Sequence, residues 1–92
     1  MFLIVLGKFR KKPTKERIIQ VRKETDAALE RLGAKRIGSY FAIGRYDYVS
    51  IFERPKETFN PAQTIRRAIE VSDDMASETL VAVNDDEVLD LL

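Results

Sequence analysis

The residues with the clearest chemical potential lie near the middle of the chain, in the run Ile43-Gly44-Arg45-Tyr46-Asp47-Tyr48-Val49. The Asp47 carboxylate could act as a general base or hold a ligand ammonium group, and Arg45 could bind an anion. Asp47 follows a tight glycine turn, where its carboxylate could equally accept backbone N–H bonds that fix the turn. The structural role of Asp47 is favoured. The alternative hypothesis is a ligand site formed by Gly44, Arg45, Tyr46 and Asp47.

The residue types that the chain lacks narrow its chemistry further. It has no cysteine and no histidine, which excludes disulfides, thiolate catalysis and Cys-based metal sites, and removes the usual general base. No P-loop, dinucleotide-binding glycine turn or nucleophile–base pair is present. We therefore expect no metal and no cofactor, assign no catalytic residues, and favour a binding protein over an enzyme.

Length and hydropathy indicate a single small domain. The 92 residues are 45% hydrophobic and 34% charged, which suits a folded protein. The apolar start is too short for a signal sequence, and no run approaches the roughly 20 residues of a membrane span. We expect a cytoplasmic protein without membrane contact, with one domain over residues 1–84 and an acidic tail over 85–92.

Charge is divided unevenly along the chain. Residues 1–46 contain twelve Lys/Arg and four Asp/Glu, whereas residues 47–92 contain four and eleven. Such asymmetry is typical of nucleic-acid-binding proteins or of dipolar, self-associating ones. The plainer interpretation, that the cations are solvated on one helix and its leading loop, is favoured.

The first two elements have strong patterns. Residues 2–9 are apolar at odd and even positions, which predicts a central strand buried on both faces. Thr14 then predicts a helix cap, and Gly33 predicts the left-handed residue that ends the helix. Between them, apolar or small residues recur at helical spacing: Ile18, Val21, Thr25, Ala28 and Leu32.

The middle of the chain predicts a β-hairpin with arms at residues 35–43 and 46–54 around a two-residue turn at Gly44-Arg45. In that register Ile43 pairs with Tyr46, Phe41 with Tyr48, Ser39 with Ser50, and Ile37 with Phe52. Aromatic pairs across a sheet are more often core or interface than ligand pocket. The candidate interface residues are Phe41, Tyr48 and Phe52.

The last third predicts a helix and a strand. Asn60 and Pro61 are a helix start, Ser72-Asp73-Asp74 is its end, and residues 75–83 are the predicted last strand. The apolar stripe of this helix is Ala62, Ile65, Ala68 and Ile69. The acidic tail contains Val88, Leu89, Leu91 and Leu92, consistent with a short helix that docks elsewhere.

The order β-α-β-β-α-β predicts an α+β, ferredoxin-like fold with a four-stranded antiparallel sheet. Both helices of that fold cover the same face of the sheet, and here the other face keeps an apolar set in either hairpin orientation. Soluble monomers rarely expose such a patch. We therefore expect self-association through the sheet, as a homodimer or a higher homo-oligomer, and possible binding of a small ligand at or beside the interface.

The chain resembles the GYD-domain family over nearly its whole length. Pro55 follows the hairpin as in that family, but Lys56 stands where an acid would be expected, which puts the family's Pro-Asp pair in doubt. The resemblance implies a dimeric α/β-barrel, in which two sheets pack face to face, and it brings no catalytic residues. The hairpin is also similar to the ligand-sensing domain of Lrp/AsnC regulators, without their DNA-binding segment. The segments that carry the GYD resemblance are Leu6-Gly7-Lys8, Leu32-Gly33-Ala34, Gly44-Arg45-Tyr46-Asp47-Tyr48-Val49 and Glu78-Thr79-Leu80.

Two alternatives remain at this stage. A cofactor-free enzyme is possible by analogy, because such oxygenases occur on dimeric α/β-barrels. An RNA-recognition motif has the same element order, and Tyr46 to Ile51 partly fits its third strand. Asp47 places a carboxylate beside the stacking surface, however, so nucleic acid is the disfavoured partner. The cations that could hold phosphates are Lys8, Arg10, Lys11, Lys12, Lys15 and Arg17.

Overall fold

The computed structural model describes residues 1–54, 61–71 and 73–92, so the predictions at Pro55, Lys56, Asn60 and Ser72 lie outside the described residues. The four strands form one antiparallel sheet in the order β2-β3-β1-β4. This is the ferredoxin-like fold that the sequence predicts. Its elements are β1 (Phe2–Phe9), α1 (Lys15–Glu30), β2 (Lys35–Phe41), β3 (Tyr48–Glu53), α2 (Pro61–Glu70), β4 (Met75–Ala82) and α3 (Asp85–Leu89).

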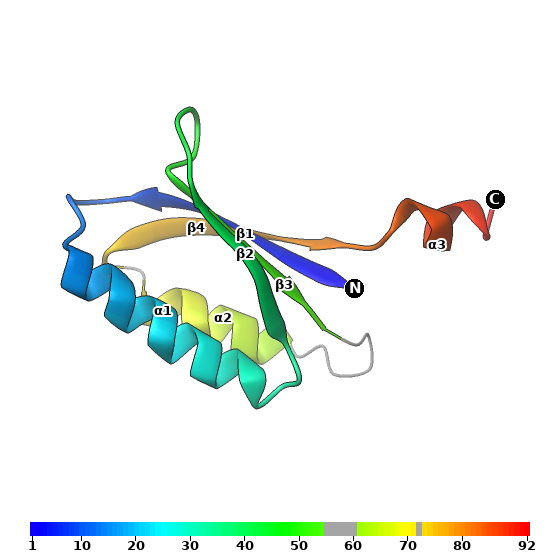
Figure 1. Cartoon of the computed structure of the whole chain (residues 1–92), viewed down its shortest axis with the longest axis horizontal. Coiled ribbons are helices and arrows are strands. Elements are labelled where there is room, and N and C mark those ends of the chain that lie inside the picture. Colours follow the sequence, from blue (N-terminus) through cyan, green and yellow to red (C-terminus); the bar gives the residue numbers. More distant parts are fainter. Residues whose placement is uncertain (55–60, 72) are drawn as a thin grey trace.

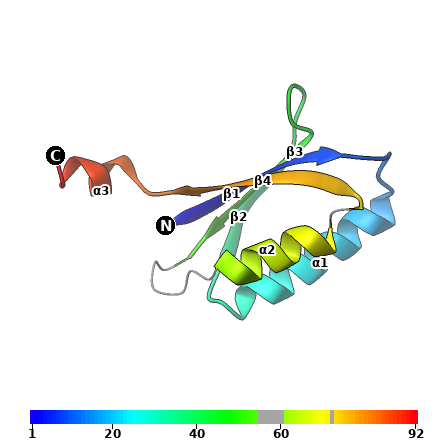
Figure 2. The same ribbon diagram turned by 180° about the vertical axis from the view of Figure 1, so that it is seen from behind.

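Both long helices lie on the same side of the sheet, and α1 and α2 run next to each other in both views (Figures 1 and 2). The loop between β2 and β3 projects from the sheet on the side away from the helices, and the segment that ends in α3 extends away from the body (Figure 1). Two features are thus left uncovered by the described part of the chain: one face of the sheet and the C-terminal segment.

The first strand and helix follow their predictions closely. β1 spans residues 2–9 and is central, between β3 and β4, but it is not buried on both faces in the single chain, because only Leu3 and Gly7 on the helix side are buried. The Thr14 hydroxyl accepts a 3.1 Å hydrogen bond from the Arg17 N–H, which confirms the cap, and Gly33 has a φ of 75°, where only glycine is unstrained. The apolar stripe was wrong at Ala28, which is exposed, whereas Leu29 is buried. Leu29 lies four residues after Thr25 and therefore continues the same helical face.

The hairpin confirms two predicted pairs and corrects two. Phe41 pairs with Tyr48 and Ser39 with Ser50, but a bulge at Ile37 makes Arg36 the partner of Phe52. Because the bulge adds one residue to β2, it turns the Arg36 side chain toward the helices, where Ile37 was expected.

The turn is also longer than the two-residue turn that was predicted. The Ala42 N–H donates to the Asp47 carbonyl at 2.9 Å, so Ile43 and Tyr46 belong to the loop and do not form a strand pair. Gly44 has a φ of 143°, a conformation that side-chain-bearing residues rarely adopt. The prediction of a turn glycine at Gly44 is therefore confirmed, but the predicted two-residue turn was too short.

The apolar stripe of α2 does not face the sheet. Ile65 and Ile69 are both exposed, although they were expected in the core; the side chain of Ala68 is outside the description. Arg67 instead reaches α1, where its Nη2 donates to the Val21 carbonyl. Residues two positions either side of Arg67 point nearly the opposite way along a helix, which explains why the two isoleucines face outward.

The buried core is small and lies where β1 begins, β3 ends and α1 ends. Leu3, Leu29, Ala34 and Phe52 are buried together. Met1, Val5 and Leu32 pack against this cluster. Toward the other end of the sheet, the space between helices and strands is a cavity, and the candidate site is built around it.

Candidate functional site

A cavity of about 510 Å³ lies between the two long helices and the sheet. Alternation along the strands supplies one wall, because every second residue of β1, β3 and β4 points to the helices. Small-molecule sites typically enclose roughly 300–1,000 Å³, so this space is large enough for a ligand. Its apolar lining includes Leu3, Val5, Phe9, Ile18, Val21, Leu29, Tyr48, Phe52 and Met75, with hydroxyls from Thr25, Ser50, Ser77 and Thr79.

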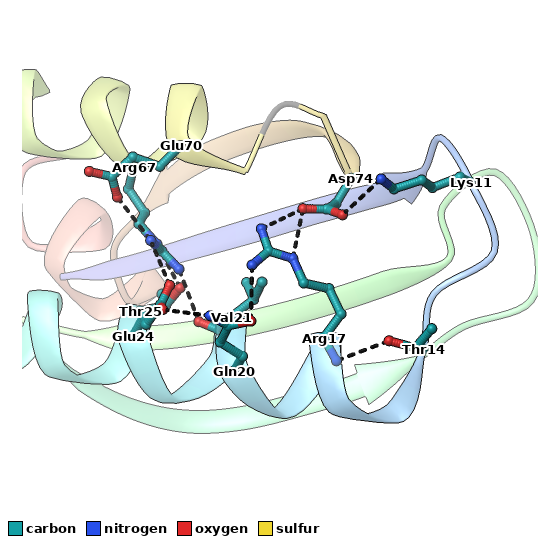
Figure 3. Close-up of polar contacts among 10 residues, drawn as sticks. All are labelled: Lys11, Thr14, Arg17, Gln20, Val21, Glu24, Thr25, Arg67, Glu70 and Asp74. Atoms are coloured by element: carbon teal, nitrogen blue, oxygen red, sulfur yellow. Dashed lines mark hydrogen bonds and ion pairs between the residues drawn. The ribbon is translucent and has the colours of Figure 1, made fainter.

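An ion pair closes one end of the cavity. The Arg17 guanidinium donates to Asp74 Oδ2 from Nε at 2.9 Å and from Nη2 at 2.6 Å, and Lys11 Nζ lies 3.7 Å from Asp74 Oδ1 (Figure 3). Hydrogen bonding to Arg17 holds the pKa of the Asp74 carboxyl below its ordinary value, while partial burial opposes that shift. The same bond raises the pKa of Arg17. This pair joins the start of α1 to the start of β4.

This pair predicts a measurable acid sensitivity. Because the folded-state pKa of Asp74 is lowered, its contribution to stability is present above the unfolded-state value near pH 4 and is lost as pH falls below it. The free energy of unfolding of Asp74→Asn, measured by urea titration, is therefore expected to decrease less than that of the unchanged protein as the pH falls from about 5 to about 2. The same smaller decrease is expected of Arg17→Gln. An unchanged acid slope in both variants would show that the pair contributes nothing.

A second arginine ties the helices together above the cavity. Arg67 of α2 donates from Nε to Thr25 Oγ1 at 2.7 Å and from Nη2 to the Val21 carbonyl at 3.0 Å, and its Nη1 lies 2.9 Å from Glu70 Oε2 (Figure 3). The hydrogen bond to Arg67 lowers the pKa of Glu70. Nη1 of Arg67 is also 3.9 Å from a Glu24 carboxylate oxygen. The guanidinium thus fixes the spacing of α1 and α2.

A third arginine stands at the core end of the cavity. Arg36 Nε lies 2.6 Å from Asp26 Oδ1, and Nη1 donates to Ser50 Oγ at 3.0 Å and to the Ser39 hydroxyl. The guanidinium lies over the Phe52 ring, 4.6 Å from its centroid. Among the described lining residues, six are cationic and three are acidic. Each of the three arginines is paired with a carboxylate: Arg17 with Asp74, Arg36 with Asp26 and Arg67 with Glu70. The cations are Lys11, Lys12, Arg17, Arg22, Arg36 and Arg67; the acids are Glu70, Asp73 and Asp74.

The predicted ligand residues Gly44, Arg45, Tyr46 and Asp47 lie together at the hairpin tip, apart from the described lining of the cavity. Asp47 Oδ2 accepts the Phe9 N–H at 3.0 Å, and the Asp47 N–H donates to the Gly7 carbonyl at 2.8 Å. The favoured structural role of Asp47 is therefore confirmed, because its carboxylate fastens the hairpin to β1.

The other two side chains at the hairpin tip also have contacts. The Tyr46 hydroxyl donates to Glu78 Oε2, which raises the pKa of Tyr46 above its ordinary value. The Arg45 guanidinium lies 5.8 Å from the Tyr46 ring centroid. Glu78 belongs to β4, so this contact passes over β1 and joins the hairpin loop to the edge strand β4.

The predicted interface residues share the helix side of the sheet. Tyr48 and Phe52 line the cavity. Phe41 packs edge-on against Tyr48 with ring centroids 5.3 Å apart, and both rings lie 6.4 Å from Phe9. Phe52 is 2% exposed. The uncovered face therefore carries the other hairpin set.

We call that uncovered surface the open face. By alternation, its apolar members are Phe2, Ile4, Leu6, Tyr40, Val49, Ile51, Leu80 and Ala82. No described element covers it in either view (Figures 1 and 2). Its charged residues stand at the two ends: Lys8 and Glu78 near the hairpin loop, and Lys35 paired with Glu53 at the other end. The middle of the open face is apolar.

Sequence reasoning missed the cavity and its three arginines. Arg17, Arg36 and Arg67 come from three separate elements. Arg17 was considered only as a cation that could hold phosphate, and Arg36 and Arg67 were assigned no role. The one usable signal was Arg67, which lies among the small and apolar residues of α2. Within the described residues there is no cluster of three or more acidic side chains that could hold a metal, and no described helix is long and apolar enough to cross a membrane.

Comparison with known proteins supports the fold alone. No protein-family model matches this chain, and no curated protein does. Among solved structures, a formyltetrahydrofolate deformylase from Pseudomonas putida KT2440 is similar, with a TM-score of 0.60 and 13% sequence identity. The match covers 89% of this chain and 29% of the deformylase chain, so this chain spans less than a third of that protein.

Proposed function

We propose that this chain self-associates through the open face, with a second copy packed sheet to sheet. The observation that carries the proposal is the apolar middle of that face, which no described element covers. A patch of this kind on a small protein is typical of a protein–protein contact. The resemblance to the GYD family supports the same arrangement, since it implies two sheets that form a dimeric α/β-barrel.

The charges of the open face support a second copy over a strongly charged partner. Each end carries one cation and one acid, Lys8 with Glu78 and Lys35 with Glu53, so the face has no net charge. A two-fold contact is self-complementary, and it allows each cation to meet an acid of the other copy. An apolar centre with a polar rim is also the usual anatomy of a protein interface.

The test is the solution mass of the unchanged protein by light scattering after size exclusion, at low and high salt. The chain has a mass of 10.6 kDa, and we expect at least twice that value at both salt concentrations, because apolar burial is not screened by ions. A mass of 10.6 kDa at both would refute the proposal. Association that disappears at high salt would also contradict it, since it would depend on charge.

We propose, second, that the cavity binds a small molecule with an apolar body and one anionic group. The supporting observation is an apolar lining whose described cations outnumber its acids, with Arg17, Arg36 and Arg67 each held by a carboxylate. This moves the expected ligand site from the hairpin tip to the helix side of the sheet. Binding of such a ligand stabilises the folded state in proportion to its concentration over the dissociation constant.

The cavity proposal can be tested with the fluorescent aromatic anion 8-anilinonaphthalene-1-sulfonate. Thr79 lines the cavity, whereas its neighbour Leu80 points to the open face. Thr79→Phe is expected to fill the cavity and weaken binding of the probe about tenfold or more, a change of roughly 1.4 kcal/mol. Ile19→Phe adds bulk at an exposed position of α1 outside the described lining, and it is expected to leave probe binding unchanged. Equal binding by both variants would place the probe outside the cavity.

A further inference from the structure

The C-terminal segment, residues 84–92, exposes four large apolar side chains. Leu91 is 86% exposed and Leu92 is 95% exposed, and Val88 and Leu89 are exposed as well. The segment also contains four acids and no cation. We call it the acidic arm. It follows β4 and projects beyond the sheet, away from the helices (Figures 1 and 2).

The opposite end of the molecule is basic. Its exposed cations follow the end of β1 and lead into α1: Lys8, Arg10, Lys11, Lys12 and Lys15. The hairpin loop is fastened to the same end, because Asp47 binds the backbone of Gly7 and Phe9. Ile43 in that loop is fully exposed. We call this region the basic end; it combines positive charge with an exposed apolar side chain.

The acidic arm does not reach the basic end of its own chain. Lys8 pairs with Ala76, at the start of β4, whereas the arm begins beyond Ala82 at its other end. The strand between Ala76 and Ala82 spans about 20 Å, at about 3.4 Å per residue. An arm of mainly helical rise covers only roughly 14 Å. A contact between the acidic arm and the basic end therefore has to be made between two molecules.

We propose that the acidic arm of each copy docks on the basic end of a second copy. The inference rests on the proposed self-association and specifies its geometry: the open faces pack with the β1 strands of the two copies running in opposite directions. A two-fold axis perpendicular to the strands then sets each arm against the other copy's basic end, so the contact is made twice. The arm acids meet the lysines and arginines, and Leu91 and Leu92 cover Ile43.

The absence of cysteine in the chain makes a clean cross-linking test possible. One sample carries Leu91→Cys in the arm, and a second carries Lys8→Cys at the basic end. After the two samples are mixed and mildly oxidised, we expect a disulfide-linked mixed dimer, identified by mass spectrometry of the linked peptides. The control partner is Ile65→Cys, on the exposed apolar stripe of α2, and it is expected to cross-link far less.

The outcomes separate this inference from the proposed self-association. A stable dimer in which Leu91→Cys links no faster to Lys8→Cys than to Ile65→Cys would refute the arm contact and leave sheet packing standing. Linking of Leu91→Cys to itself would refute the opposite strand directions, because both arms would lie at one end. A monomer in solution would refute both proposals together.

Charge exchange provides an independent test. Asp85→Lys with Asp86→Lys in the arm is expected to weaken association about tenfold, and Arg10→Glu with Lys12→Glu at the basic end is expected to do the same. All four changes in one chain are expected to restore association to near its original strength. If the combined variant is as weak as either pair, the two regions do not meet.

Discussion

Replacing Phe52 with alanine is expected to lower the free energy of unfolding by about 3–5 kcal/mol, the usual cost of removing a buried aromatic side chain. Phe52 is 2% exposed, packs in the cluster with Leu3 and Leu29, and carries the Arg36 guanidinium over its ring. The core contains few buried residues, so the loss is a large fraction of the total stability. Urea titration followed by circular dichroism measures it.

Phe41→Ala is the matched control for this prediction. Phe41 is an aromatic residue of the same hairpin but is 66% exposed. Its loss is expected to cost about 1 kcal/mol or less. Should Phe52→Ala fail to fold, the smaller change Phe52→Leu keeps the comparison measurable. Similar costs at Phe41 and Phe52 would mean that the core is not where the structure places it.

Leu80→Glu is expected to convert the self-associated protein to a monomer. Leu80 lies on β4 beside Ile4 in the apolar middle of the open face, and it is 42% exposed in the single chain. In a sheet-to-sheet contact the new carboxylate would be buried without a partner, which costs several kcal/mol. We expect association to weaken by about 100-fold or more, equivalent to roughly 2.7 kcal/mol. Light scattering over a dilution series measures the change.

Ile19→Glu is the control for the open-face variant. Ile19 is also an exposed aliphatic residue, at 55%, but it lies on α1. It is expected to keep the mass of the unchanged protein. Circular dichroism of both variants verifies that they remain folded. If Leu80→Glu stays associated, or if Ile19→Glu dissociates as readily, the contact surface is not the open face.

Much of the architecture could be predicted from local patterns. The run at residues 2–9, apolar at odd and even positions, predicts the central strand, and Thr14 and Gly33 bracket α1 because capping and left-handed geometry are properties of single residues. The order of the elements then identifies the ferredoxin-like fold. At Asp47 the carboxylate does bind the backbone, but it accepts the N–H of Phe9 in β1, a tertiary contact that the local turn pattern does not contain.

The errors arose where tertiary structure overrode local pattern. In the stretch Arg36-Ile37-Gly38, alternation favours Ile37 as the residue that points to the helices. The bulge instead turns Arg36 to that side, where it contacts Asp26, Ser50 and Phe52. In α2 the contacts of Arg67 with α1 fix the orientation of the helix and turn Ile65 outward. No single-residue propensity contains either effect.

The candidate site was the least predictable feature. The cavity is lined by residues of all four strands and both long helices, which are distant in sequence, and its charge depends on which arginines turn inward. The open face was predictable in principle, because any single layer of helices leaves one sheet face bare. The residues on the open face could not be predicted, since they depend on which of the two hairpin sets the helices cover.

The central claim, that a second copy covers the open face, is tested most directly by isotope-filtered NMR on an equal mixture of labelled and unlabelled protein. The account predicts contacts between copies from the methyl groups of Ile4, Val49, Ile51 and Leu80, all on the open face. It predicts none from Ile19 of α1, which is exposed on the helix side. Contacts between copies from the helices, with none from the four open-face residues, would contradict it.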